Sequence, residues 1–403
     1  MDKQRQKEIL QLTKNLDITP TMRKDAEEKY QAIATYLQSH GIECNIYPQG
    51  SFALGTVVRP LDKDAFDLDT ICEISVDKSN TTARETKESV GKVLLDSERY
   101  GDVIEYETCW TKEYANEFNI DIVPAVDEER VKKEYLVAKS ILNKDLAAQS
   151  IAITKGTEST YRWSTSNPKG YREWFGNINR PFLQYDRKNK RQVIFAENRA
   201  LFDSVEEIPE SDERSALQVA IQILKRHRDV YFLILNDDKE NRPISAIITT
   251  IAAGIAQGLP YNLSPFELLG KIAETLKIYA KLDTMEQIRF TQQYASLNLI
   301  RRDNGQWRLL NPVNPDDNLL DSWNTSTGRG KAFFKWISEV VKDFETFSSA
   351  TDMEYYAAAK TVFGCDLVEN TSAFAKYKDT ASKTYTPIVT PVKPWKGVDS
   401  VLR

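Results

Sequence analysis

"QGSFALGTVVRPLDKDAFDLDTICEI", residues Gln49 to Ile74, joins a Gly-Ser turn to a run that is typical of a core strand. In that run Asp67 and Asp69 are two residues apart, so both side chains face one side of an extended chain, while Phe66 and Leu68 face the other. Two carboxylates so close repel each other, and one takes up a proton unless a cation lies between them. The pattern therefore predicts a cation beside this strand.

A third acid lies on a later apolar run. Asp121 in "NIDIVPAV" is flanked by isoleucines, so it lies on a strand of its own, and it faces the same site if that strand lies beside Asp67 and Asp69. Three such carboxylates can hold two divalent cations, which bridge an attacking hydroxyl and the phosphates of a nucleotide. Upstream, Gly50 and Ser51 allow backbone N–H groups and a hydroxyl to approach a phosphate. The set predicts a phosphoryl-transfer site that takes a nucleoside triphosphate with two Mg²⁺ or Mn²⁺ ions.

An isolated Asp-x-Asp pattern more often marks a solvated turn, and a lone Gly-Ser pair is weaker still. The full order is much rarer: a Gly-Ser turn, an apolar-flanked Asp-x-Asp, a later apolar-flanked Asp and then a helical region. We therefore favour the catalytic interpretation.

Composition sets the class of protein. The chain has 403 residues, is 41% hydrophobic and carries a formal net charge of −5, which predicts a soluble globular protein of two or three domains. It contains no apolar run as long as a membrane span, and its start lacks the apolar core of a signal peptide, so we expect a cytoplasmic protein without membrane contact. A mildly acidic chain is not expected to bind nucleic acid generally. The scattered cysteines indicate buried thiols rather than a zinc site or disulfides: Cys44, Cys72, Cys109 and Cys365.

The first half of the chain reads as mixed α/β and the part after about Pro209 as helical, which predicts an α+β fold. Thr19-Pro20 and Gly41 predict the ends of a long amphipathic helix. "DVIEYETCW" (102–110) and "EFNIDIVPAV" (117–126) predict neighbouring strands separated by "TKEYANE". Residues 154–192 are rich in Gly, Pro, Asn and aromatics and are expected to form an ordered surface segment. The proline-rich end predicts an extended tail.

Four further motifs narrow the family: "SNPKGYREWF" (166–175), "LQVAIQILKRHRD" (217–229), "PISAIITT" (243–250) and "NPVNPDDNLLDSW" (311–323). With the Gly-Ser turn and the acids, the chain resembles the DNA polymerase β-like nucleotidyltransferases and, within them, the bacterial cGAS/DncV-like nucleotidyltransferases (CD-NTases) of CBASS antiphage systems. The resemblance covers nearly the whole chain.

This resemblance implies an enzyme that joins ribonucleoside triphosphates, ATP or GTP or both with pyrimidines also open, into a cyclic di- or trinucleotide second messenger. It implies a nucleotidyltransferase core at residues 1–205 with a long N-terminal helix, a helical domain at 206–384, an extended tail at 385–403, and an active site in the cleft between the lobes. In many relatives the tail is captured by a CBASS accessory protein. Capture usually requires a small terminal residue, whereas this chain ends in Val-Leu-Arg. We therefore favour a disordered end slightly over a captured tail.

Carried over by position, Asp67, Asp69 and Asp121 resemble the metal triad of the family. Gln49, Gly50 and Ser51 resemble its triphosphate-binding turn, and Lys225 and Ser245 resemble contacts to the triphosphate from the second lobe. The long spacer after Ser51 places Asp62 and Asp64 in a loop.

Several assignments stay open. "KRHRD" (225–229) fits a solvated, salt-bridged helix face as well as a phosphate clamp, and we expect His227 to pack rather than to catalyse. Five aromatics could stack on a base but fit packing of the connecting segment better: Tyr161, Trp163, Tyr171, Trp174 and Phe175.

Two rival functions remain. One is a nucleotidyltransferase that modifies an RNA, a protein or an antibiotic, and the acidic composition disfavours the RNA version. The other is an inactive nucleotide-binding regulator, which would usually have lost an acid, and none is missing here.

Overall fold

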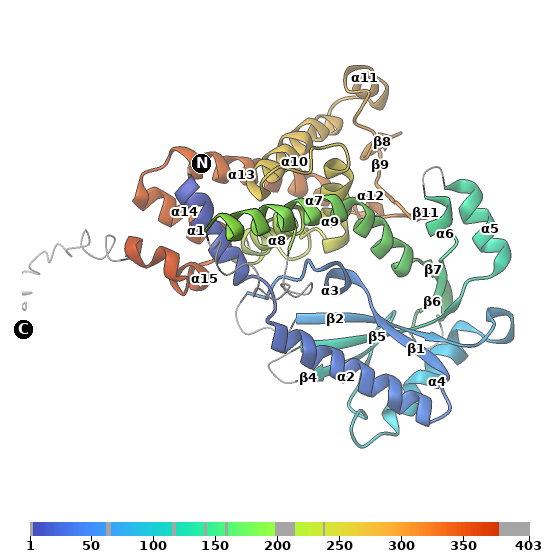
Figure 1. Ribbon diagram of the computed structural model, residues 1–403. Coiled ribbons are helices and arrows are strands. Elements are labelled where there is room, and N and C mark those ends of the chain that lie inside the picture. Colours follow the sequence, from blue (N-terminus) through green and yellow to red (C-terminus); the bar gives the residue numbers. More distant parts are fainter. Residues whose placement is uncertain are drawn as a thin grey trace, which may run out of the picture.

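The computed structural model describes residues 3–61, 66–114, 118–140, 143–157, 160–197, 214–236 and 238–378. They form two lobes, a mixed β-sheet with helices and a mostly helical lobe packed above it (Figure 1). This arrangement agrees with the α+β fold expected from the sequence.

The sheet is built around two buried strands that run parallel, β2 (Phe66–Ile74) and β5 (Phe118–Asp127). The strand order is β1-β2-β5-β4-β3, and β6 pairs with both β5 and β7 through antiparallel ladders. The remaining strands of the sheet are β1 (Cys44–Pro48), β3 (Ile104–Glu105), β4 (Trp110–Tyr114), β6 (Ile151–Lys155) and β7 (Arg162–Ser166). The parallel register places Asp69 directly opposite Asp121, so the two acid-bearing strands are neighbours, as the sequence pattern required.

Helices surround the sheet and build the second lobe. Beside the sheet lie α2 (Pro20–Ser39), α3 (Gly50–Leu54), α4 (Ala83–Leu95), α5 (Arg130–Lys139) and α6 (Lys144–Ala147). Two further helices from the first half of the chain, α1 (Lys3–Lys14) and α7 (Pro168–Glu197), contribute to the core of the helical lobe. The others are α8 (Ala216–Asp229), α9 (Ser245–Ala256), α10 (Pro265–Tyr279), α11 (Gln287–Gln293), α12 (Asp321–Thr325), α13 (Thr327–Ser349), α14 (Asp352–Phe363) and α15 (Cys365–Glu369). A π-helical turn at Val230–Leu235 extends α8. Short 3₁₀ turns lie at Lys78–Asn80, Ala280–Asp283 and Ser372–Phe374.

The long helix predicted near the N-terminus is confirmed as α2. Thr19 caps it by accepting a hydrogen bond from the Met22 backbone N–H, and Pro20 occupies the first turn. Gly41 follows the helix with φ +85°, a conformation that favours glycine. On α2, Ile33 packs into the core of the sheet.

The strand predicted at 102–110 is wrong in its position. Within that range Ile104–Glu105 forms β3 and Trp110 begins the main strand, β4, which runs into the expected connection. The predicted neighbourhood is confirmed, because β4 pairs with β5. The buried Lys87 ammonium explains the shift, because it donates to the Tyr106 and Glu107 carbonyls at 2.5 and 3.1 Å and so uses backbone acceptors that a strand would need.

The predicted surface segment at 154–192 is also corrected. It completes β6, forms β7 and then enters the 30-residue helix α7. Trp174, Phe175, Ile178 and Phe182 follow helical spacing and are buried in the core of the helical lobe, which outweighs the Gly, Asn and Pro content of this stretch.

Sequence reading also missed four short strands in the helical lobe, which form two hairpins: β8 (Arg301–Asp303), β9 (Gln306–Arg308), β10 (Leu310–Asn311) and β11 (Asn314–Asn318). Cys44, Cys72 and Cys109 are buried as expected, whereas Cys365 is exposed at the start of α15.

The N-terminal segment contacts both lobes. Ile9 and Leu12 of α1 belong to the core of the helical lobe, while α2 packs on the sheet. The domain boundaries predicted near residues 205 and 384 fall outside the described residues, as does the predicted tail at 385–403. Among the helices described, none combines the length and the apolar character that a membrane crossing requires.

Candidate active site

The Gly-Ser turn is fixed against the acid-bearing strand β2. The backbone N–H of Gln49 donates to the Asp69 carbonyl at 2.8 Å, and Gly50 begins α3 with φ +59°. A Cβ atom at Gly50 would lie 2.6 Å from Oδ2 of Asp69. Both the backbone conformation and this close approach therefore require glycine, and they bring the predicted phosphate turn next to a predicted metal ligand.

The three acids lie on adjacent positions of β2 and β5. Asp69 is opposite Asp121, and the exposed Asp67 is opposite Asn119. Thr111 on β4 donates to Oδ1 of Asp121 at 2.5 Å, and Asn119 donates to Oδ1 of Asp67 at 3.2 Å. Neighbouring side chains thus hold two of the three carboxylates in place. The other acids of the loop, Asp62 and Asp64, lie outside the described residues.

Two of the acids, Asp69 and Asp121, have a raised pKa. Burial is the main cause that raises the pKa of Asp69 to about 7, followed by the charges of Asp121 and Asp67. Burial also raises the pKa of Asp121 above its ordinary value, and the charge of Asp67 adds to the effect. The repulsion expected from the sequence is present, so a bound cation would stabilise the ionised acids.

As positioned, no three acidic, histidine or cysteine side chains in the described ranges are grouped to hold a metal. The hydrogen bonds from Asn119 and Thr111 each engage one carboxylate oxygen and leave the other. Three carboxylates are nevertheless the hard oxygen donors that Mg²⁺ and Mn²⁺ take. In donor chemistry the residues fit a divalent cation, and side-chain rotation would have to bring them together.

Lys225 of α8 reaches across to the turn. Its ammonium donates to Ser51 Oγ at 2.8 Å, to Thr56 Oγ1 at 2.9 Å and to the Thr56 carbonyl at 3.1 Å, and the side chain is 2% exposed. Burial, followed by the charge of Arg228, lowers its pKa to about 7. The family resemblance implied a second-lobe lysine at this position, and Lys225 lies in contact with Ser51 of the turn.

The alternative of a solvated face for residues 225–229 is wrong. Lys225, Arg226, His227 and Arg228 are all buried, because α8 lies between the lobes. Arg226 donates to the Phe363 and Arg59 carbonyls, which satisfies its guanidinium inside the protein. A charged run can be buried where backbone carbonyls accept its hydrogen bonds.

His227 packs, as expected. Trp336 Nε1 donates to its Nδ1 at 3.0 Å, and its Nε2 lies 3.1 Å from Asp343.

Ser245 begins α9, and its hydroxyl accepts from Arg228 at 3.1 Å. Asp229 pairs with Arg228 and with Arg242, at 2.7 and 3.0 Å. Arg228 belongs to the run weighed as a phosphate clamp, whereas Arg242 was not considered from the sequence, because only its ion pair with Asp229 brings it to this cavity.

These groups line one cavity of about 460 Å³. The turn, Asp67 and Asp69 form one wall, and α8 and α9 form the other. Its lining includes Gly50, Ser51, Asp67, Asp69, Tyr171, Lys225, Arg228, Asp229, Arg242 and Ser245. Asp121 is not in this lining but lies one strand away, opposite Asp69. The volume is in the range of small-molecule sites.

Of the five aromatics weighed for base stacking, Tyr171 lines this cavity, and its hydroxyl is hydrogen-bonded with Thr250 at 2.7 Å. Trp174 and Phe175 lie in the helical core, which confirms the packing interpretation for both. Tyr161 donates to Glu105, and the Lys78 ammonium lies over Trp163.

The chain is similar to known cyclic dinucleotide synthases. A family model described as the Second Messenger Oligonucleotide or Dinucleotide Synthetase domain matches residues 4–179. The chain is 29% identical over 345 residues to a c-di-GMP synthase of Roseivirga ehrenbergii, covering 84% of this chain and 78% of that protein. It is 25% identical over 245 residues to the cyclic dinucleotide synthase CdnG of Bradyrhizobium diazoefficiens, covering 56% and 53%.

The structure of the Bradyrhizobium diazoefficiens CD-NTase CdnG in complex with GTP has the same fold. It matches with a TM-score of 0.62 and 18% identity over 92% of this chain and 97% of that one. Together with the Gly-Ser turn, the paired acid-bearing strands and the two-lobed architecture, these similarities support a nucleotidyltransferase enzyme of the CD-NTase kind.

Proposed function

We propose that this CD-NTase uses GTP and joins two nucleotides into a cyclic dinucleotide. In each of two rounds a ribose hydroxyl oxygen bonds to the α-phosphorus of a triphosphate, the bond to the β-phosphate breaks, pyrophosphate leaves and the hydroxyl proton goes to solvent. The observation that carries the proposal is one cavity that brings Gly50, Ser51, Asp67, Asp69 and Lys225 together. The choice of GTP follows the c-di-GMP synthase and the GTP complex of CdnG.

The turn and α8 would bind the triphosphate from two sides. Backbone N–H groups at Gly50 and Ser51 would face a phosphate bound at the start of α3, while Lys225 would contact it from the opposite lobe. Because the Lys225 pKa is lowered to about 7 in the cavity, a polyanion beside it would favour its protonated form. Binding would therefore move Lys225 from Ser51 and Thr56 toward the phosphates.

The acids would hold the cations. We assign Asp67, Asp69 and Asp121 as ligands of two Mg²⁺ or Mn²⁺ ions, which when bound offset charge on the triphosphate and lower the pKa of the acceptor hydroxyl. Thr111 and Asn119 limit the orientations of two of these carboxylates. Ser245, Arg228 and Arg242 form the second-lobe wall beside the phosphates.

We place the activity in CBASS antiphage defence and in the cytoplasm, where ribonucleoside triphosphates are available. The last described residues are anchored near the N-terminus, because Tyr377 donates to Glu8 at 2.9 Å and Lys376 pairs with Glu8 at 2.8 Å. Residues 385–403 lie outside the described part, and their capture by an accessory protein stays a prediction.

The test is incubation of the purified chain with labelled GTP, ATP, CTP and UTP, singly and mixed, with Mg²⁺ or Mn²⁺ and no acceptor. We expect a phosphatase-resistant product from GTP with the mass of a cyclic dinucleotide, and none from the Asp67→Asn/Asp69→Asn variant.

A cyclic product that contains no guanosine would refute the choice of GTP and leave cyclisation standing. Label that appears only on added RNA, protein or antibiotic would instead support the acceptor-modifying alternative.

A further inference from the structure

A second, larger cavity lies outside the nucleotide cavity. Its volume is about 670 Å³, and none of its lining residues lines the nucleotide cavity. Its walls come from the end of α1, the start of α2, the start of α8 and single residues of α7 and α10. Leu10, Ile18 and Val219 supply apolar surface. The volume suits a small organic molecule.

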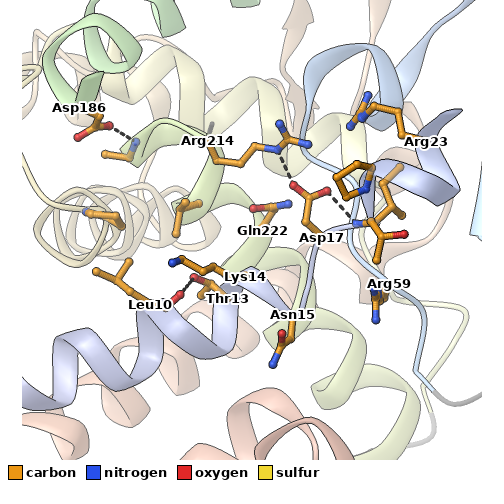
Figure 2. A pocket seen from close by; sticks show the side chains of 16 residues that line it. Leu10, Thr13, Lys14, Asn15, Asp17, Arg23, Arg59, Asp186, Arg214 and Gln222 are labelled. Atoms are coloured by element: carbon orange, nitrogen blue, oxygen red, sulfur yellow. Dashed lines mark hydrogen bonds and ion pairs between the residues drawn. The ribbon is translucent and has the colours of Figure 1, made fainter. Parts of the chain in front are cut away.

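Positive charge exceeds negative charge in this cavity. The basic lining residues are Lys14, Arg23, Arg59 and Arg214, and the acidic ones are Asp17 and Asp186. Both acids are already engaged: Asp17 pairs with Arg214 at 2.6 Å, and Asp186 accepts from the Ala216 backbone N–H at 2.8 Å. In Figure 2 the side chains of Lys14, Arg214 and Arg59 surround Asp17 and Gln222.

Two of these cations have no anionic partner in the part of the chain that the structure describes. The exposed Lys14 ammonium forms no ion pair or hydrogen bond there, and the Arg59 guanidinium forms none either. The Nε atom of Arg59 is buried without a hydrogen-bond partner in those same residues. A buried donor of this kind costs about 1–3 kcal/mol when left unsatisfied, and an anion nearby would offset the charge.

The wall of this cavity is continuous with the nucleotide turn. Gln222 of α8 lines the cavity and donates to the Val57 carbonyl at 2.8 Å, and the Arg23 guanidinium lies 4.6 Å from the ring centre of Phe52 in α3. One turn further along α8, Lys225 contacts Ser51 and Thr56. Segment 54–61 therefore separates the two cavities, and α8 binds it from one side.

We propose that this cavity is a second ligand site, which takes a small organic anion with an apolar body and a carboxylate or phosphate group, and that its occupancy is coupled to nucleotide binding through α8 and residues 54–61. Lys14 and Arg59, which have no anionic partner among the described residues, bind the anionic group, and the apolar wall contacts the body. We expect coupling because a ligand that contacts Arg59 and Gln222 would shift residues 54–61, the segment that directly follows the triphosphate turn.

The probe is 8-anilinonaphthalene-1-sulfonate, an aromatic anion that fluoresces when bound in apolar surroundings. We expect one saturable site on the wild-type protein, with its Kd raised about tenfold or more in Lys14→Glu and in Arg59→Gln. The matched control is Lys3→Glu, an exposed lysine of the same helix outside the cavity. Near-UV circular dichroism verifies that each variant keeps its tertiary packing. Equal Kd values in the three variants and the wild type would overturn the proposed site.

Competition identifies the anionic group. Displacement of the probe by phenyl phosphate indicates a phosphate ligand and displacement by phthalate a carboxylate ligand, and displacement by neither argues against the site. Coupling is tested by repeating the titration with saturating α,β-methylene GTP, which cannot release pyrophosphate, and a shift of about fivefold or more in the probe's Kd is expected. An unchanged Kd would refute the coupling. The binding measurements need no turnover, so they are independent of the product that the enzyme makes.

Discussion

Lys225→Met tests the buried lysine that joins the two lobes. The wild-type ammonium is 2% exposed and donates to Ser51 and Thr56. Burial lowers its pKa from 10.5 to about 7. Methionine keeps most of the length and apolar volume of the side chain but cannot bind a proton.

The direction in which wild-type stability changes with pH follows from proton binding by Lys225. Between pH 7 and 10.5 the unfolded chain keeps the Lys225 proton and the folded chain loses it, so the unfolded state binds more protons and wild-type stability rises with pH. The slope is at most about 1.4 kcal/mol per pH unit. Below pH 7 both states are protonated and the slope from this group vanishes. The variant has no such proton, so the free energy of unfolding of wild type minus variant should rise by about 2–3 kcal/mol from pH 7.5 to 9.5.

The assay is urea unfolding followed by tryptophan fluorescence at several pH values, with Lys24→Met at an exposed lysine of α2 as the matched control. At constant pH, kcat/KM for GTP should also fall roughly 10- to 100-fold, because one charge-assisted contact to the triphosphate is lost. A stability difference that stays flat from pH 7.5 to 9.5 would show that Lys225 keeps its proton in the fold, and the account of its burial would be wrong.

Three further substitutions address the acids and the turn. Asp121→Asn should leave the metal-free Tm unchanged or raised, because burial and the charge of Asp67 disfavour the charged form of Asp121. Product formation should nevertheless fall about 100-fold or more. A lower Tm with near-normal activity would show that this acid serves the fold. Thr111→Val should lower kcat for cyclic product about 10-fold while Thr111→Ser restores most of it, since the hydroxyl orients Asp121; equal rates in both variants would remove that role. Gly50→Ala should lower the free energy of unfolding by about 1–2 kcal/mol and reduce activity, because φ is +59° and the new Cβ meets Asp69; an alanine variant with wild-type Tm and rate would contradict the required glycine.

The parts of the site that were predictable depend on local patterns. Asp67, Asp69 and Asp121 interrupt apolar strands, and the period of two places Asp67 and Asp69 on one face of their strand. That Asp121 joins them depends on the pairing of β2 with β5, which the structure supplies. Gly50 was found because a tight turn before a short helix has a residue signature. Each of these signals is contained in fewer than ten neighbouring residues.

The missed parts depend on distant contacts. Nothing within "KRHRD" tells a buried run from a solvated one, because its acceptors are carbonyls of residues 56, 59 and 363. The position of β4 depends on Lys87, which lies on another element. The cavity beside α1 joins residues from five helices, so no stretch of sequence could indicate it.

The buried polar row of α8 explains how the two lobes can act as one site. Gln218, Gln222 and Lys225 donate to the carbonyls of Leu54, Val57 and Thr56 at 2.9, 2.8 and 3.1 Å. Each donor would cost about 1–3 kcal/mol if it stayed buried but lost its carbonyl partner. These hydrogen bonds therefore hold the segment that follows the triphosphate turn to the helical lobe. Triphosphate binding would recruit the Lys225 member of this row and leave the two glutamines in place. The lobes can therefore stay joined while the lysine changes partners, and we expect the Gln218→Met and Gln222→Met variants to lose stability before they lose affinity for GTP.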